Sequence, residues 1–110
     1  MPTRVDTLSI FDREVKTLHR KYPAITDALA NLADELERGQ RPGTRVPRVA
    51  ATVHKVRLPN PSARRGKRGG FRILYHVKSQ RHLVLIAIYA KTEHVDITDA
   101  EIRQRIAAVR

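Results

Sequence analysis

The sequence predicts an α+β fold of two layers, in which an antiparallel β-sheet is packed by an N-terminal helical hairpin and followed by a C-terminal helix. The first observation is the order of hydrophobic periods, which runs strand, helix, helix, three strands, helix. The second is that the three consecutive strands have short connections, and such strands pair antiparallel. The third is composition, because 110 residues with 41% hydrophobic and 30% charged side chains are typical of one folded domain, residues 1–110.

The N-terminal part changes its period after one short strand. Residues Thr3 to Ile10 alternate loosely and predict an edge strand. Apolar residues then recur at spacings of four, three and four in two consecutive stretches, which predicts an apolar face on each of two helices. These faces consist of Phe11, Val15, Leu18 and Tyr22, then Ile25, Leu29, Leu32 and Leu36. Pro23 separates the helices because it lacks an N–H, and Gly39 ends the second helix as a left-handed C-cap.

The C-terminal part contains three predicted strands and one helix. Residues Gln40 to Ala51 show neither period and predict a loop. The strands are expected over Thr52–Leu58, Phe71–Lys78 and His82–Ala90, the last of which is apolar on both faces. A capping box at Thr98-Asp99-Ala100-Glu101 opens a helix that we expect to run from Asp99 to Val109.

Composition also excludes several classes of protein. The chain has no cysteine, so disulfides, thiolate zinc sites and cysteine nucleophiles are excluded. The five histidines do not occur at metal-ligand spacing with a carboxylate neighbour, and we expect no metal and no other cofactor. The longest apolar run, Leu83 to Ala90, is too short to span a bilayer, and the N-terminus lacks a signal-peptide pattern. We therefore expect a cytoplasmic protein with no membrane partner.

The net charge of +11 is concentrated in one part of the chain. Of the 22 Lys and Arg residues, thirteen lie between Arg41 and Thr92, a segment without a single Asp or Glu. The flanking residues 1–40 and 93–110 contain all eleven acidic residues and are close to neutral. A positive field of this kind favours a polyanionic partner, because neutralising phosphates releases condensed counterions. Nucleic acid is the first candidate partner, and an acidic protein segment is the second.

Basic side chains gather on one face of the predicted sheet. Alternation puts Lys55 and Arg57 on one face of their strand, and Arg72 joins them if the next strand pairs in that register. RNA can be cut without a metal when its own 2′-hydroxyl attacks phosphorus, which requires a base, an acid and cations for the transition state. Arg57 and Arg72 suit the phosphate, and Lys55 suits the base. Tyr89 is a candidate acid or stacking platform, and Lys91, which points the same way, would extend the rim of the site.

A second group of basic residues lies in the loop from Ala63 to Gly70. Its glycines allow backbone amides to approach phosphates. Its four cations are Arg64, Arg65, Lys67 and Arg68. We expect this loop to grip RNA or the ribosome, although an ordinary basic surface turn would have the same composition. His76 shares the predicted face of Arg72 and is a reserve acid–base and RNA-binding candidate.

Three segments carry a more specific signal: Val-His-Lys-Val-Arg at 53–57, Gly-Lys-Arg-Gly-Gly-Phe-Arg-Ile-Leu-Tyr at 66–75, and Ile-Tyr-Ala-Lys at 88–91. Together they resemble the RelE/ParE superfamily of bacterial toxins, in the branch near HigB-like members, and the RelE-like order β-α-α-β-β-β-α agrees along the chain. The resemblance implies the toxin of a type II toxin–antitoxin system, a ribosome-dependent mRNA endonuclease that inhibits translation and is neutralised by a cognate antitoxin. It implies contact with operator DNA through the antitoxin complex alone. By position, Lys55, Arg57 and Arg72 match the basic residues that such toxins use on their concave sheet.

Two alternatives to this function remain open. RelE-like members carry an arginine where this chain has Thr92 and a tyrosine where it has Thr98, so Tyr89 or Lys91 would have to supply the acid. The first alternative is a ParE-like inhibitor of DNA gyrase, although such an inhibitor does not require a phosphate-cleaving cluster of cations. The second is a non-catalytic RNA-binding protein, such as a decayed toxin, which would bind RNA with strong salt dependence and never cut it.

Overall fold

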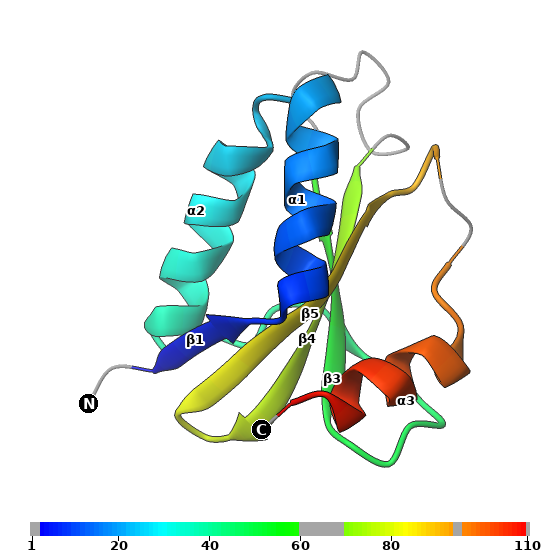
Figure 1. Cartoon of the computed structure of the whole chain (residues 1–110). Coiled ribbons are helices and arrows are strands. Elements are labelled where there is room, and N and C mark those ends of the chain that lie inside the picture. The colour runs from blue at the N-terminus through cyan, green and yellow to red at the C-terminus, as the bar shows by residue number, and fades with distance from the viewer. Residues whose placement is uncertain (1–2, 60–69, 94–95, 110) are drawn as a thin grey trace.

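A computed structural model describes residues 3–59, 70–93 and 96–109 of the chain. Its elements, in chain order, are β1 (Arg4–Thr7), α1 (Ser9–Lys21), α2 (Ile25–Glu37), β2 (Thr44–Arg45), β3 (Val53–Leu58), β4 (Phe71–Ser79), β5 (His82–Ala90) and α3 (Asp99–Ala107) (Figure 1). The α+β class and the order of the predicted elements are confirmed, with β2 as an addition inside the expected loop. Within the described residues, no helix is long and apolar enough to cross a membrane.

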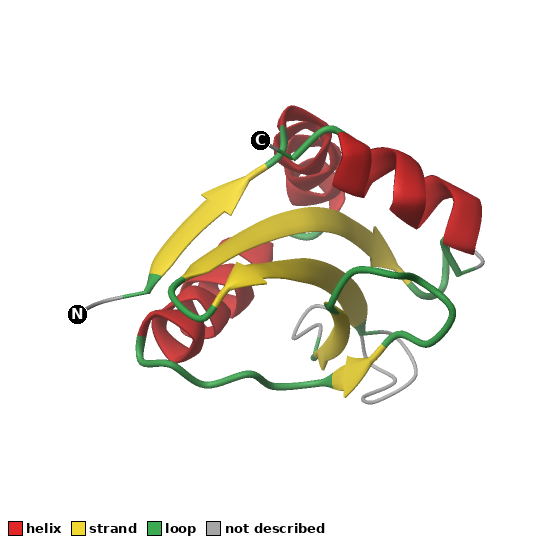
Figure 2. Cartoon of the chain, turned by 90° about the horizontal axis from the view of Figure 1, so that it is seen from below, coloured by secondary structure: helices red, strands yellow, loops and turns green. Residues whose placement is uncertain are grey.

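The five strands form one mixed sheet in the order β1-β5-β4-β3-β2. β3, β4 and β5 pair antiparallel as predicted, and β2 adds antiparallel to β3. β1 pairs parallel to β5, so the expectation of a purely antiparallel sheet is wrong. The reason is that two helices connect β1 to the other strands. A connection of that length allows β1 to pair either parallel or antiparallel with its neighbour in the sheet. β1 and β2 form the two edges of the sheet (Figure 2).

The helical hairpin covers one face of the sheet and forms the larger core with it. Its buried members on the helices are Phe11, Ile25, Leu32 and Leu36. They pack against the strand residues Val56, Phe71, Ile73, Tyr75, Leu83, Leu85, Ile88 and Ala90. This arrangement follows from the two sequence periods, since one helical face and every second strand residue are apolar.

The C-terminal helix α3 packs on the other face, so the fold is not a simple two-layer structure. Ile102 of α3 is buried with Leu74 of β4, Ile86 of β5, and Val49 from the segment between β2 and β3. The predicted capping box starts this helix, because the Thr98 hydroxyl accepts from the backbone N–H of Glu101 and the Glu101 side chain accepts from that of Thr98. α3 covers this face only in part, and the remaining part holds the basic residues described below.

A β-bulge in β5 decides which of its side chains face which layer. Leu74 of β4 pairs with Ala87, whereas the next residue, Tyr75, pairs with Leu85, so Ile86 is an extra residue. As a result Leu85 and Ile88 belong to the core on the hairpin side, while Ile86, Ala87 and Tyr89 belong to the core on the other side. Without the extra residue, strict alternation would have put Tyr89 on the side of Leu85.

The backbone groups freed by this bulge are bound by one ion pair. Arg105 of α3 donates to the carbonyl oxygen of Ile86 at 2.8 Å and to Glu14 of α1 at 2.7 Å. Glu14 in turn accepts from the backbone N–H of Ile88 at 3.3 Å. The Glu14–Arg105 pair therefore joins α1, α3 and β5 at the point where the regular ladder is interrupted.

Candidate nucleic-acid interface

A row of three polar residues crosses the sheet on the face that α3 covers only in part. Arg57 on β3 pairs directly with Arg72 on β4, and Arg72 pairs directly with Tyr89 on β5. Lys55 lies two residues from Arg57 and therefore on the same face of β3. The prediction that Arg72 joins Lys55 and Arg57 is thus confirmed by the strand register. The structure also brings Tyr89 to this face, which the sequence left conditional.

Arg72 is the buried member of this row, with 6% of its surface exposed. Among the described residues, no carboxylate lies within 4.0 Å of its guanidinium, whose hydrogen bond to the carbonyl of Phe71 is long at 3.4 Å. Burial, followed by the charge of Arg57, lowers the pKa of Arg72. Arginine nevertheless stays ionised in proteins, so two guanidinium charges are held side by side at a cost in folding free energy.

Gly70 provides the space that Arg72 and the end of β3 require. A Cβ atom at this position would lie 2.5 Å from the carbonyl oxygen of Leu58 and 3.3 Å from Nη1 of Arg72. Any side chain would therefore push β4 away from β3 at the point where the two arginines pair. This requirement gives a physical reason for the glycine that precedes Phe71 and Arg72 in the sequence.

A cavity of about 610 Å³ opens beside the two arginines. Four cationic side chains line it: Arg45, Lys55, Arg57 and Arg72. The segment from Pro42 to Pro47 also lines the cavity. Gly43 in this segment has a φ of +96° and lies so close to β3 that a Cβ atom would be 2.4 Å from the Lys55 carbonyl oxygen, so only glycine fits there. None of the described residues that line the cavity is acidic. Its shape and charge suit an anionic group that bridges several guanidinium and ammonium donors.

Next to this cavity, Asp96 draws three of the predicted site residues together. One carboxylate oxygen, Oδ1, accepts from the hydroxyl of Tyr89 at 2.8 Å and from the ammonium groups of Lys55 and Lys91 at 3.1 Å each. These contacts, the one with Tyr89 first, hold the pKa of Asp96 far below its usual value. Burial, and then the hydrogen bond to Asp96, raise the pKa of Tyr89, so the phenol stays protonated at neutral pH.

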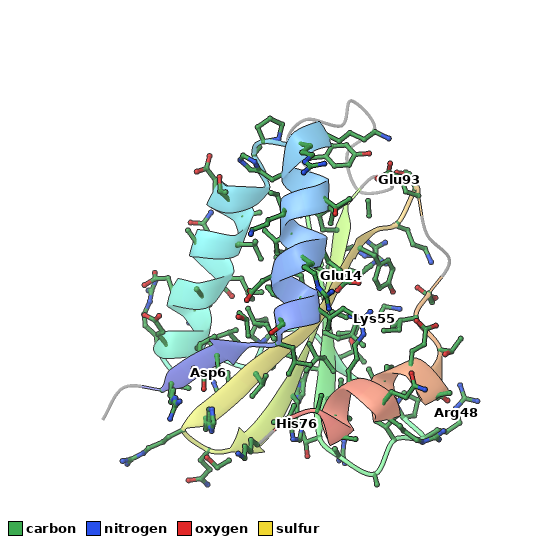
Figure 3. The ribbon with its side chains drawn as sticks, viewed as in Figure 1. Asp6, Glu14, Arg48, Lys55, His76 and Glu93 are labelled. Atoms are coloured by element: carbon green, nitrogen blue, oxygen red, sulfur yellow. The ribbon has the colours of Figure 1, made fainter. Side chains whose placement is uncertain are left out.

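Asp96 is the site residue that the sequence interpretation missed. It lies just outside the acid-free segment, among the near-neutral residues 93–110. The one available signal is its position, five residues after Lys91 and two before the capping residue Thr98, in a connection too short to move far from the end of β5. Figure 3 labels Lys55, which projects from β3 toward the region between β5 and α3.

The other predicted site residues are not part of this cluster. His76 is on the Arg72 face but four residues further along β4, about 13 Å away, and its Nδ1 contacts the carbonyl of Thr52 at 3.0 Å. In Figure 3 His76 lies near the lower end of the sheet, below Lys55. The loop cations Arg64, Arg65, Lys67 and Arg68 lie outside the described residues, so their expected contact with RNA remains a prediction.

Across residues 3–59, 70–93 and 96–109, no group of three or more His, Cys, Asp or Glu side chains is placed to hold a metal ion. The charged groups that converge are instead cations from three strands and one aspartate. No known protein family and no curated protein matches the sequence.

Proposed function

We propose that this protein binds RNA through the Lys55, Arg57 and Arg72 face and cleaves messenger RNA on the ribosome without a metal ion, as the toxin of a toxin–antitoxin pair. The observation that carries the proposal is the pair of adjacent arginines, one of them buried, beside a cavity whose charged lining residues, within the described part of the chain, are all cationic. Burying a charge without a carboxylate partner destabilises a fold. Such an arrangement is understandable when an anionic ligand supplies the missing partner.

The proposed roles follow from the chemistry of each side chain. Arg57 and Arg72 would grip the non-bridging oxygens of the scissile phosphate and stabilise the charge that develops on them. Lys55 would act as the base in its neutral amine form, after its ammonium has given one proton to solvent, and would then take the proton from the 2′-hydroxyl as that oxygen attacks phosphorus. Tyr89 or Lys91 would give a proton to the leaving 5′-oxygen, and the raised pKa of Tyr89 ensures that its phenol carries one.

Binding to single-stranded RNA, measured by fluorescence anisotropy at several salt concentrations, tests the phosphate contacts. Arg72→Met should weaken binding and reduce the slope of log affinity against log salt by about 0.7, the value for one phosphate contact on a single strand. The matched control is Lys16→Ala, which removes one positive charge from an exposed position on α1. An equal effect of both substitutions would show that net charge, and not this site, binds the RNA.

Cleavage and toxicity test the enzymatic part of the proposal. Lys55→Ala and Arg72→Met should each abolish growth arrest on induction and cleavage of messenger RNA by purified protein with ribosomes. Lys16→Ala should retain both. RNA binding without cleavage, with or without ribosomes, would identify a non-catalytic RNA-binding protein. Inhibition of gyrase supercoiling by the purified protein would identify the ParE-like alternative.

The proposed partner is an antitoxin with an acidic, partly disordered segment. A basic cavity on a folded domain suits such a segment, because the contacts formed with the cavity offset the conformational entropy that the segment loses when it becomes ordered. The adjacent gene product, produced together with this chain, should co-purify with it and suppress its toxicity.

A further inference from the structure

Asp96 is the acidic residue that reaches into the basic face of the sheet. Its Oδ1 atom lies within hydrogen-bond distance of three donors, the Nζ atoms of Lys55 and Lys91 and the hydroxyl of Tyr89. These donors come from β3, from the residue after β5 and from β5 itself. A single carboxylate oxygen with three convergent donors is a geometry in which a phosphate oxygen is bound equally well.

The charge around Asp96 is not balanced by this contact. Lys55 and Lys91 share one carboxylate, while Arg57 and Arg72 of the neighbouring row have no ion pair among the described residues. The charge of Arg72 acts on Asp96 as well, and the Asp96 side chain remains 48% exposed. A single aspartate therefore leaves net positive charge that a diester backbone with successive phosphates can neutralise.

We propose that Asp96 occupies the position of a phosphate group of the RNA, and that RNA binds by displacing the Asp96 carboxylate from Lys55, Tyr89 and Lys91. This inference rests on the proposed function, since it concerns regulation of the same site. Asp96 then acts as a built-in competitor that lowers the affinity for any anion able to reach only these three donors. A polyanion that also engages Arg57 and Arg72 overcomes this competition, so the device favours RNA over isolated phosphate groups.

The test compares two substitutions that change the net charge equally. Asp96→Asn removes the competing charge and keeps the size of the side chain. Glu93→Gln is the control, because Glu93 is a neighbour in sequence that pairs with Lys21 at the end of α1. In Figure 3 Glu93 lies well away from Lys55. Binding of a fluorescein-labelled single-stranded RNA is measured by anisotropy for the wild type and both variants, after thermal melts have established that each is folded.

The affinity of Asp96→Asn for RNA should exceed that of the wild type by about 3- to 10-fold, as expected when two half-exposed ion pairs no longer compete with the ligand. Glu93→Gln should change the affinity by less than about two-fold. An equal rise in both variants would mean that long-range charge alone matters, and this would overturn the proposal. An unchanged or lower affinity of Asp96→Asn would also overturn it, since Asp96 would then only tie its segment to the sheet.

Two further measurements separate this inference from the proposed function and from defects in folding. Inorganic phosphate, titrated by NMR, should bind Asp96→Asn more tightly than the wild type even if none of the proteins binds RNA. That combination would refute RNA as the ligand, and with it the proposed function, but would support displacement of Asp96 by a phosphate group, whereas equal phosphate binding would refute displacement. In the wild type, the carboxyl carbon resonance of Asp96 should shift as RNA is added, and its pKa should rise toward the ordinary value. A resonance that stays constant at saturating RNA would contradict displacement.

Discussion

Replacing Arg72 by methionine should make the protein more stable while it weakens RNA binding. Arg72 is 6% exposed, pairs across the strands with Arg57, and has no carboxylate within 4.0 Å among the described residues. An unpaired buried charge costs several kcal/mol in the limit of full burial. Here the guanidinium borders an open cavity, and the charge of Asp96 acts favourably on it, so part of that cost is offset.

The expected net gain for Arg72→Met is about 1 kcal/mol, because methionine keeps much of the apolar stem and removes the desolvated charge. Urea denaturation at neutral pH, followed by circular dichroism, measures this gain. With a slope typical of small domains, 1 kcal/mol corresponds to a rise of about 0.5–1 M in the midpoint. Arg57→Met is the matched control, since it removes an exposed member of the same pair and should stay within about 0.5 kcal/mol of the wild type.

A loss of more than about 1 kcal/mol in Arg72→Met, with Arg57→Met unchanged, would refute this reasoning. Arg72 would then hold the sheet together, and its burial would need no ligand to explain it. An increase in stability together with weaker RNA binding would place Arg72 among residues that are kept for function at the expense of the fold.

Two other predictions concern the ion pairs that surround the site. Glu14→Gln should destabilise the protein by about 1–3 kcal/mol in urea denaturation, because it leaves the partly buried Arg105 without its carboxylate, while Glu37→Gln, exposed at the end of α2, should be neutral. If the two substitutions have equal effects, the bulge does not depend on this pair. Because the folded pKa of Asp96 is depressed, its stabilisation is present above the unfolded value near 3.8 and is lost as pH falls through the lower folded value. The stability difference between the wild type and Asp96→Asn should therefore be constant from pH 7 to about pH 5 and shrink in more acidic solution. A difference that does not depend on pH would contradict the contacts of Asp96.

The sequence predicted the elements whose periods are clear and failed where pairing is non-local. The predicted bounds of β4 agree with the structure to within one residue at its C-terminal end. This strand alternates clearly, with apolar residues on one face and Arg72, Leu74 and His76 on the other. The parallel pairing of β1 with β5 has no signal in either strand, because it depends on how the intervening hairpin packs. β2 was missed because two residues, Thr44 and Arg45, are too few to show a period.

The sequence also predicted those residues of the site that local alternation places, and it missed those that depend on a bulge or on a non-local contact. Alternation placed Lys55, Arg57 and Arg72 correctly, because β3 and β4 pair without irregularity along the residues from 53 to 58. β5 is apolar on both sides, so its sequence gives no indication of the extra residue at Ile86 and leaves the direction of Tyr89 undecided. Asp96 was missed because its approach to Lys55 is a contact between segments 41 residues apart, and no local pattern encodes it.

The extra residue in β5 also restricts how the gene can change. Before Ile86 the odd-numbered residues of β5 face the helical hairpin, and after it the even-numbered residues do. Deleting a single codon near this point would exchange Tyr89 with the apolar residues that flank it, and would point a phenol into the hairpin core. Point substitutions at surface positions leave this phase intact, whereas insertions and deletions shift it. We therefore expect the length of β5 to vary less among descendants of this gene than its composition does.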